Sequence, residues 1–271
     1  MLSRRGFVTS VGALAAPAAL MAYTPTAFAL PLDAGSTATA PLQELIRQRL
    51  SSELGATGIA RTLEPHLFDV AFTWRPPTVP AASIDSIVAY AFGNRPNADS
   101  GNTSVGGGNQ AALPDPGPTN ELLADAVHAI RQLRPVKVYA QWEIARFLVS
   151  KYGYGPDQLF SVEPIIAADG TITYLSTDGV AAAAITEAGS AAALGQVAVV
   201  GHRDHVKRCV MTSAARGMKA ATAAEIELPV AYDALSGQPW TRDRDIYLVH
   251  DMFAQLFVLS LSLVAAAYPA S

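Results

Sequence analysis

The chain has 271 residues, of which 50% are hydrophobic and 15% charged, and its formal net charge is −4. A disordered chain combines few apolar residues with many charges, so this composition excludes one. The negative charge argues against nucleic-acid binding, which requires clustered Lys and Arg. A single cysteine, Cys209, excludes an intramolecular disulfide and a cysteine-based zinc site. We expect Cys209 to be a buried, small apolar residue within a helix.

The first 29 residues have the layout of an export signal. Arg4 and Arg5 stand in a Ser-Arg-Arg-x-Phe arrangement that looks like a twin-arginine signal. A weakly apolar stretch over 11–23 follows, and the Ala-Phe-Ala triplet at 27–29 places small residues where a signal peptidase cleaves. The alternative is an N-terminal membrane anchor, but the apolar stretch is short and interrupted by proline. We therefore predict cleavage after residue 29 and a periplasmic or extracellular protein.

After the signal, residues 30–83 form an N-terminal extension, and from residue 84 short apolar runs alternate with stretches of helical spacing. The apolar runs are four to six residues long, which is typical of strands, and the helical stretches between them are longer. Strands are predicted at 87–92, 136–140, 159–162, 197–200 and 225–230, and helices at 42–54, 119–133, 143–151, 181–188, 204–218 and 242–264.

This alternation predicts the α/β class, with a Rossmann-like parallel sheet covered by helices on both faces. The organisation is then a signal peptide (1–29), an extension (30–83) and one Rossmann-like domain (84–271). The strands at 87–92, 136–140 and 197–200 should be adjacent, parallel and buried. The apolar end Leu256 to Ala267 is too short to span a membrane, so we expect no transmembrane span in the mature protein. It is expected to cover the sheet or to dock on a partner.

Polar side chains cluster where the predicted strands end. In a doubly wound sheet, ligands bind beyond the carboxyl ends of the strands, where helix N-termini present N–H groups and partial positive charge. Each cluster also has a plain structural explanation as a turn pair, a packing tryptophan or a helix cap. The candidate ligand-binding residues are Gly93, Asn94, Arg95, Trp142, Thr177, Asp178, His202, Asp204 and Arg208, and the candidate catalytic residues are Glu143 and His205.

The segment from His202 to Arg208 carries the sharpest signal. His205 and Arg208 are three residues apart, so both can lie on one face of the helix that follows. An arginine fork suits bidentate binding of a phosphate or carboxylate, and a histidine beside it can donate a hydrogen bond or transfer a proton. The alternative is that Asp204 caps the helix and forms a surface pair with Arg208. A metal site from His202, Asp204 and His205 is not expected, because no further ligand with recognisable spacing joins them.

These features resemble the SanA/YdcF/ElyC-like family of bacterial envelope-associated proteins. Gly93-Asn94-Arg95 takes the place of that family's glycine-rich turn, and Ser176-Thr177-Asp178 takes the place of its threonine-containing segment. His205 and Arg208 match its His-x-x-Arg block after a strand. The resemblance implies a Rossmann-like fold over residues 84–250 and a role in the cell envelope.

We carry three functional hypotheses forward. The leading one is an exported protein that binds a small anionic ligand, such as a phosphorylated compound, in a bacterial envelope process. Arg208 and the helix start at Asp204 would hold the anion, and Trp142 would stack on a ring. The second is a hydrolase or transferase acting on an envelope phosphate or glycan, with Glu143 or His205 as general base. The third is a non-catalytic protein that docks on a partner through its apolar C-terminal helix. The sequence does not indicate which cofactor, if any, the protein binds.

Overall fold

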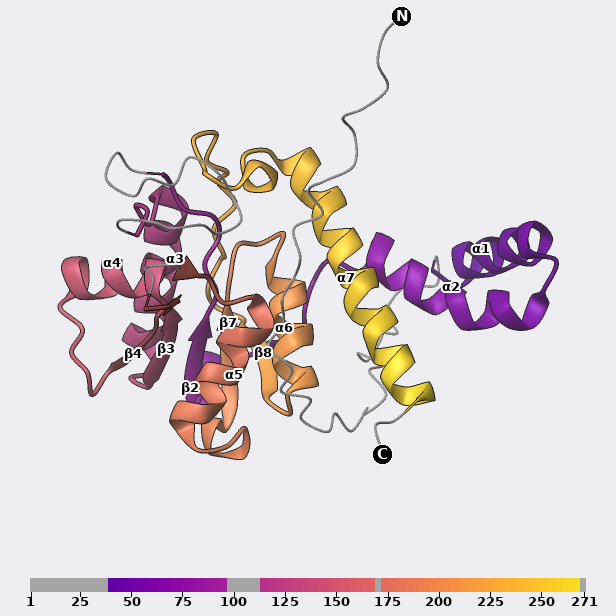
Figure 1. Cartoon of the computed structure of the whole chain (residues 1–271). Helices are drawn as coiled ribbons and strands as arrows, with labels where there is room; N and C mark the ends of the chain where they lie inside the picture. The colour runs from indigo at the N-terminus through magenta and orange to yellow at the C-terminus, as the bar shows by residue number, and fades with distance from the viewer. Residues whose placement is uncertain (1–38, 97–112, 169–171, 269–271) are drawn as a thin grey trace, which may run out of the picture.

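Six strands form a parallel sheet in this computed structural model, which describes residues 39–96, 113–168 and 172–268. The order across the sheet is β1-β8-β7-β2-β3-β4 (Figure 1). The predicted α/β class, with a parallel sheet between two helical layers, is confirmed. The strands are β1 (Thr78–Val79), β2 (Ser86–Ala89), β3 (Lys137–Gln141), β4 (Leu159–Val162), β7 (Gln196–Val200) and β8 (Lys219–Ala223).

The three central strands β7, β2 and β3 are adjacent and parallel, as predicted. Ile87 of β2 lies opposite Val138 of β3 and Ala198 of β7. Every residue of β2 is buried, and so are the last four of β7. Because helices cover both faces, these strands are continuous apolar runs instead of alternating ones.

Two pairs of helices enclose the sheet, one pair on each face. Leu123 and Ile144 pack with Ile87 on one face, and Val180 and Val210 pack with Val88 on the other. Cys209 lies fully buried in this second core, as predicted, and burial raises the pKa of its thiol. The first face is covered by α3 (Pro118–Leu133) and α4 (Trp142–Tyr152), and the second by α5 (Thr177–Ala188) and α6 (Val206–Ala215).

The last strand of the sheet differs from the prediction. The alternating residues 225–230 were expected to form it, but they lie outside any strand, and β8 is formed by residues 219–223. The reason is that α6 ends early, at Ala215, and Gly217 turns the chain back with a φ of 87°. Lys219, Ala220 and Ala221 then pair with β7, and lysine and alanine give little strand signal in a sequence.

Helix caps are predicted correctly in some places and wrongly in others. Ser176 caps α5 by accepting a hydrogen bond from the Gly179 N–H, at 3.2 Å, as its chemistry predicts. Thr119 was expected to cap α3, but it lies inside the helix, and Gly117 occupies the cap position without a side-chain bond. Asp204 likewise does not cap α6, because His205 holds that position.

The N-terminal region contributes two helices and one strand. Helices α1 (Thr39–Leu54) and α2 (Thr57–Phe72) form a hairpin that projects from the sheet (Figure 1). Pro65 lies inside α2. β1 then joins the edge of the sheet beside β8. A buried ion pair ties the hairpin to the core: Lys207 Nζ of α6 lies 2.9 Å from Asp69 Oδ2 of α2.

Helix α7 (Arg244–Ala267) closes the described chain and matches the predicted helix over 242–264. Its buried side chains, Tyr247, Asp251 and Gln255, are spaced four residues apart and contact the rest of the protein. Among the described helices, α7 alone is long and apolar enough over Arg244–Val264 to cross a membrane, judged by length and composition. A small antiparallel pair, β5 (Ile165–Ile166) and β6 (Ile172–Thr173), stands apart from the main sheet.

Candidate functional site

The candidate site lies at the carboxyl edge of β2, β3 and β7. The chain runs outward from β2 to β3 and β4, and then crosses back to β7 and β8 on the other side of β2. The strand order therefore reverses between β2 and β7, which is where open α/β sheets bind ligands. The structure brings several predicted residues together here, because Asn94 contacts Glu143 and the Phe92 ring stacks on His202 at 4.0 Å.

Asn94 and Glu143 form the centre of this edge, and both are buried. The Asn94 amide Nδ2 donates to Glu143 Oε1 at 3.4 Å, while Glu143 Oε2 has no hydrogen-bond partner among the described residues. Burial raises the pKa of Glu143 to about 8. The carboxyl group is therefore neutral at pH 7 and can donate a proton. This differs from the general-base role considered for Glu143, because a base must be ionised.

Trp142 begins α4 and was expected to offer its ring to a ligand. The residue is only 2% exposed, and its ring centroid lies 6.5 Å from that of Tyr174, so no open face remains. Its indole Nε1, however, is buried without a hydrogen-bond partner among the described residues. Trp142 Nε1 and Glu143 Oε2 are thus two polar atoms with unused bonding capacity on consecutive residues.

His202 and His205 are both buried beside Phe92. His202 Nδ1 accepts a hydrogen bond from the Asp204 N–H at 3.3 Å, so Nε2 carries the ring proton. Burial lowers the pKa of His202 to about 4. Burial and the nearby Arg208 charge lower the pKa of His205 to about 4 as well. Both rings are therefore neutral at pH 7.

The lowered pKa values of His202 and His205 predict how the stability of the folded protein depends on pH. Their folded pKa values of about 4 lie below the unfolded value of about 6.5, so the unfolded chain binds more protons in this window. Stability should therefore fall as the pH drops from about 6.5 to about 4, by on the order of 3 kcal/mol for each histidine. Below about pH 8 the buried Glu143 carboxyl, whose folded pKa is about 8, contributes with the opposite sign, because the folded state then binds its proton more tightly than the unfolded chain does. Denaturant unfolding at about pH 7 and pH 4.5 in the Glu143→Gln background therefore measures the loss due to the histidines.

A matched pair of variants tests the assignment. His202→Gln should remove about half of the loss between these two pH values, whereas His66→Gln on the α1–α2 hairpin should leave it in place. A loss that starts only below about pH 4 would instead identify the carboxylates Asp204 and Asp251, whose pKa values are lowered, as its source.

Asp204 has other partners than those expected of it. It lies 2.9 Å from Arg244 Nε and 3.2 Å from Arg203 Nε, and it accepts a bond from the Tyr232 hydroxyl at 2.8 Å. Burial opposes ionisation, but these hydrogen bonds outweigh it and lower the Asp204 pKa to about 2. The surface pair with Arg208, considered above as the alternative to a ligand contact, is not formed. Asp204 instead joins α6 to the segment that leads into α7.

Arg208 points toward α7. Its Nε lies 2.6 Å from Oδ1 of the fully buried Asp251, and its terminal nitrogens donate to Thr177 Oγ1 at 3.1 Å and to the Tyr247 hydroxyl at 3.3 Å. His205 Nδ1 lies 3.6 Å from the same Asp251 oxygen. Thr177, His205 and Arg208 are thus brought together as predicted, around an aspartate that sequence reasoning missed. The one sequence signal for Asp251 is an acidic residue in the middle of an apolar helix.

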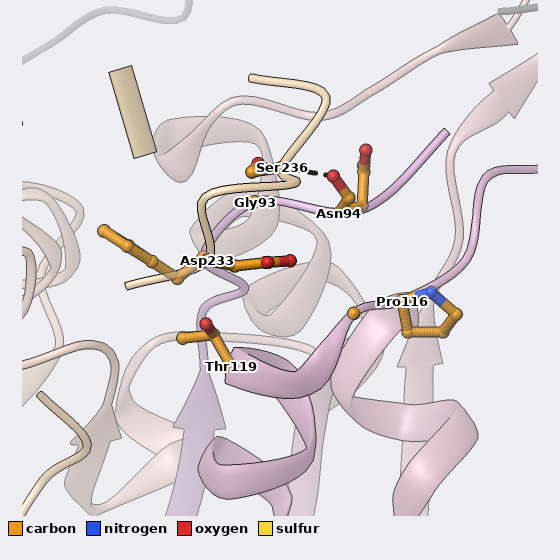
Figure 2. A pocket seen from close by; sticks show the side chains of 8 residues that line it. Gly93, Asn94, Pro116, Thr119, Asp233 and Ser236 are labelled. Carbon is orange, nitrogen blue, oxygen red and sulfur yellow. Dashed lines mark hydrogen bonds between the residues drawn. The ribbon is translucent and has the colours of Figure 1, made fainter. Parts of the chain in front are cut away.

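Gly93 and Arg95 contact the segment 231–241, which crosses the end of β2. Figure 2 shows Asp233 and Ser236 of this segment beside Gly93 and Asn94. Arg95 forms a bidentate pair with Asp233, at 2.7 and 2.8 Å. A narrow hollow remains, with no room for a water molecule between the described residues, and it is lined by Phe92, Gly93, Asn94, Pro116, Gly117, Thr119, Asp233 and Ser236.

Close packing at Gly93 gives a second prediction. Gly93 has a φ of 71°, and a Cβ added there would lie 2.7 Å from both Ser236 Oγ and Thr241 Oγ1. Gly93→Ala should therefore push the segment 231–241 away from β2 and cost about 1–3 kcal/mol of stability. Urea unfolding measures the loss, and hydrogen exchange locates it in this segment.

Gly189→Ala is the matched control, because Gly189 has a φ of 85° but open space around it. It isolates the backbone cost of about 1 kcal/mol. Equal losses in the two variants, with unchanged exchange over 231–241, would show that contact with the segment contributes nothing.

Asp178 is not part of the cluster, since it is exposed and pairs with Arg216 at the end of α6. Among the described residues, no three His, Cys, Asp or Glu side chains gather as metal ligands do. Comparison with protein-family models, curated proteins and solved structures finds no match for this chain.

Proposed function

We propose that this protein binds a small anionic ligand, such as a phosphorylated compound, at the carboxyl edge of β2, β3 and β7. Three helices, α3, α4 and α6, begin at this edge, and none of them has a side-chain cap. By contrast, Ser176 caps α5 and Asp243 caps α7. Uncapped helix N-termini that converge on one edge favour an anion there.

The observation that carries the proposal is the buried pair of unpartnered atoms, Trp142 Nε1 and Glu143 Oε2, at the start of α4. The indole N–H and the protonated carboxyl are both donors, and each can donate to an acceptor oxygen of an anion. The charged form of Glu143 would repel an anion, but its pKa of about 8 keeps it neutral at pH 7. Arg208 is not free to bind the anion, because Asp251 already neutralises its charge.

The test is a thermal-shift screen with inorganic phosphate, nucleotides and sugar phosphates, because a ligand stabilises the folded state by mass action. Binding should weaken as the pH rises through about 8, where Glu143 ionises. Glu143→Gln keeps a neutral donor, so it should retain binding and lose this pH dependence. Glu143→Ala should bind less tightly, and Asp178→Asn, outside the cluster, should behave as wild type. Shifts that are the same in Glu143→Ala and in wild type would contradict the proposal.

The enzyme hypothesis is kept as a second candidate because of one observation, the neutral Glu143 beside Asn94. A carboxylic acid that stays protonated at pH 7 can protonate a leaving group in the hydrolysis of an envelope phosphate or glycan. The two candidates separate in one variant. Glu143→Gln should bind as well as wild type under both, and only an enzyme would lose turnover.

The envelope setting and the kinship with the SanA/YdcF/ElyC-like family belong to the same proposal. They rest on Arg4-Arg5, the Ala-Phe-Ala triplet at 27–29 and the His205-x-x-Arg208 block. Residues 1–29 lie outside the described residues. Mass spectrometry of the exported protein should find Leu30 at the N-terminus, and Arg4→Lys with Arg5→Lys should hold the precursor in the cytoplasm. Exported protein that keeps residues 1–29 would exclude cleavage.

A further inference from the structure

Helix α7 changes character at Gln255. Up to that residue, one face of the helix is buried against the body through Tyr247, Asp251 and Gln255. Beyond it, no described side chain of the helix is buried. Figure 1 shows this end of α7, in yellow, lying clear of the sheet and of the α1–α2 hairpin. We call residues Leu256–Ala267 the apolar end.

The apolar end is hydrophobic around its whole circumference. Leu256, Phe257, Leu261, Leu263 and Val264 are exposed along one half of the helix, and the half-buried Val258 and Leu259 continue the apolar surface around the other half. The sequence from 252 to 271 contains no charged side chain. The Ser262 hydroxyl donates to the Val258 carbonyl at 3.0 Å, so this polar group is satisfied within the helix.

Two occupants of this surface can be compared, a second copy of the chain and a lipid bilayer. A second copy has an argument in its favour, because α7 carries a heptad stripe on the side away from the body, formed by Ile246, Val249, Phe253, Leu256, Ser260 and Leu263. A two-helix pair covers only that stripe, however, and would leave Val258 and Leu261 in water. A helix that is apolar all round needs an apolar solvent on every side.

The length of the apolar end fits one leaflet. Its twelve residues, 256–267, rise by about 1.5 Å each and extend about 18 Å, which is too short for a hydrocarbon core of about 30 Å. The first half of α7 stays on the body, because Asp251 is held by Arg208 there. Drawing Asp251 into lipid would separate this pair and expose both charges to hydrocarbon.

We propose that the apolar end of α7 inserts into the hydrocarbon of one leaflet of a lipid bilayer and fixes the protein to a membrane surface without spanning it. Lipid acyl chains are the partner. Hydrophobic burial drives the insertion, since the apolar end carries no charge to attract anionic headgroups.

The experiment places an environment-sensitive fluorophore on the full chain. Cys209 is fully buried and does not react, so Leu261→Cys can be labelled with NBD. On addition of phosphatidylcholine vesicles, the label at 261 should shift its emission to shorter wavelengths. The same label at Val249→Cys, an exposed position in the docked half, should stay in water. Because each label reports only its own surroundings, binding through residues 1–29 does not imitate the result.

A second substitution tests the cause. Val264→Asp, introduced beside the label at 261, should abolish the shift, because it places a charge in the inserted segment. Adding one third phosphatidylglycerol should leave the wild-type shift unchanged. Three outcomes would overturn the proposal: no shift at 261 with vesicles, a shift that survives Val264→Asp, or an equal shift at 249. A shift that appears without vesicles and grows with protein concentration would also overturn it and would assign the surface to a second copy.

Discussion

Val199→Asp is expected to prevent folding. Val199 is fully buried in β7, where it lies opposite Val88 of β2 in the centre of the sheet, with α5 and α6 packed over it. An aspartate there would place a carboxyl group among Val and Ala side chains with no donor or cation to satisfy it. Burying such a carboxyl, charged or protonated, without a partner costs several kcal/mol and also loses the packing of the Val199 methyl groups, which together are comparable to the roughly 5–15 kcal/mol by which domains are stable. Circular dichroism and size-exclusion chromatography of the purified variant measure the outcome.

The control for this prediction has the same chemistry at an exposed site. Val249→Asp changes a residue of α7 that is 70% exposed, so it should express, fold and melt as the wild type does. A folded Val199→Asp protein with wild-type stability would contradict the placement of β7 at the centre of the sheet.

Arg208→Ala is expected to cost about 3–5 kcal/mol, since it would leave Asp251 buried without its cation. The bonds to Thr177 and Tyr247 are lost as well. At about 2–4 °C per kcal/mol, the melting temperature should fall by roughly 6–20 °C without any ligand present. The sequence alone indicated the opposite, because an exposed pair with Asp204 contributes under about 1 kcal/mol.

Two further variants separate the pair from the fold around it. Arg208→Met combined with Asp251→Leu removes both charges and should recover much of the loss, as apolar replacements of buried ion pairs do. Arg216→Ala removes an arginine from the end of the same helix, where its partner Asp178 is exposed, and should cost under about 1 kcal/mol. If Arg208→Ala leaves the melting temperature unchanged and weakens anion binding, the arginine is a ligand contact after all.

The central part of the fold was predictable because its signals are local. The runs at 136–140, 159–162 and 197–200 are strands within one residue of the expected bounds, and Gly153 ends α4 as expected. The strand over 225–230 was wrong because the alternation of Glu225, Ile226, Glu227 and Leu228 imitates an edge strand. The small residues of β8 become a strand only through pairing with β7 and β1, which is a tertiary effect.

The position of the candidate site could be predicted from the sequence, but the ion-pair partners of its residues could not. Parallel strands end at one edge, so the residues after them had to meet there, and Asn94, Glu143 and His202 do. The partner of Arg208 could not be found in this way, because Asp251 lies 43 residues further along the chain and reaches it through the packing of α7. Local spacing indicated only Asp204 as an alternative partner, and tertiary contacts direct Asp204 to Arg203, Arg244 and Tyr232 instead.

The segment 231–241 has a consequence for the kinetics of ligand exchange. It is fastened over the end of β2 by the Arg95–Asp233 pair and by the bond from the Gly237 N–H to the Asn94 carbonyl, at 2.7 Å. The hollow beneath has no room for a water molecule, so a ligand of the kind proposed above would enter it only after this fastening opens. For such a ligand the association rate would be set by how often the segment opens, below the diffusion limit, and the apparent affinity would be reduced in proportion to the fraction of molecules that are open. Salt weakens the partly exposed Arg95–Asp233 pair, and so it should accelerate both entry and release of that ligand.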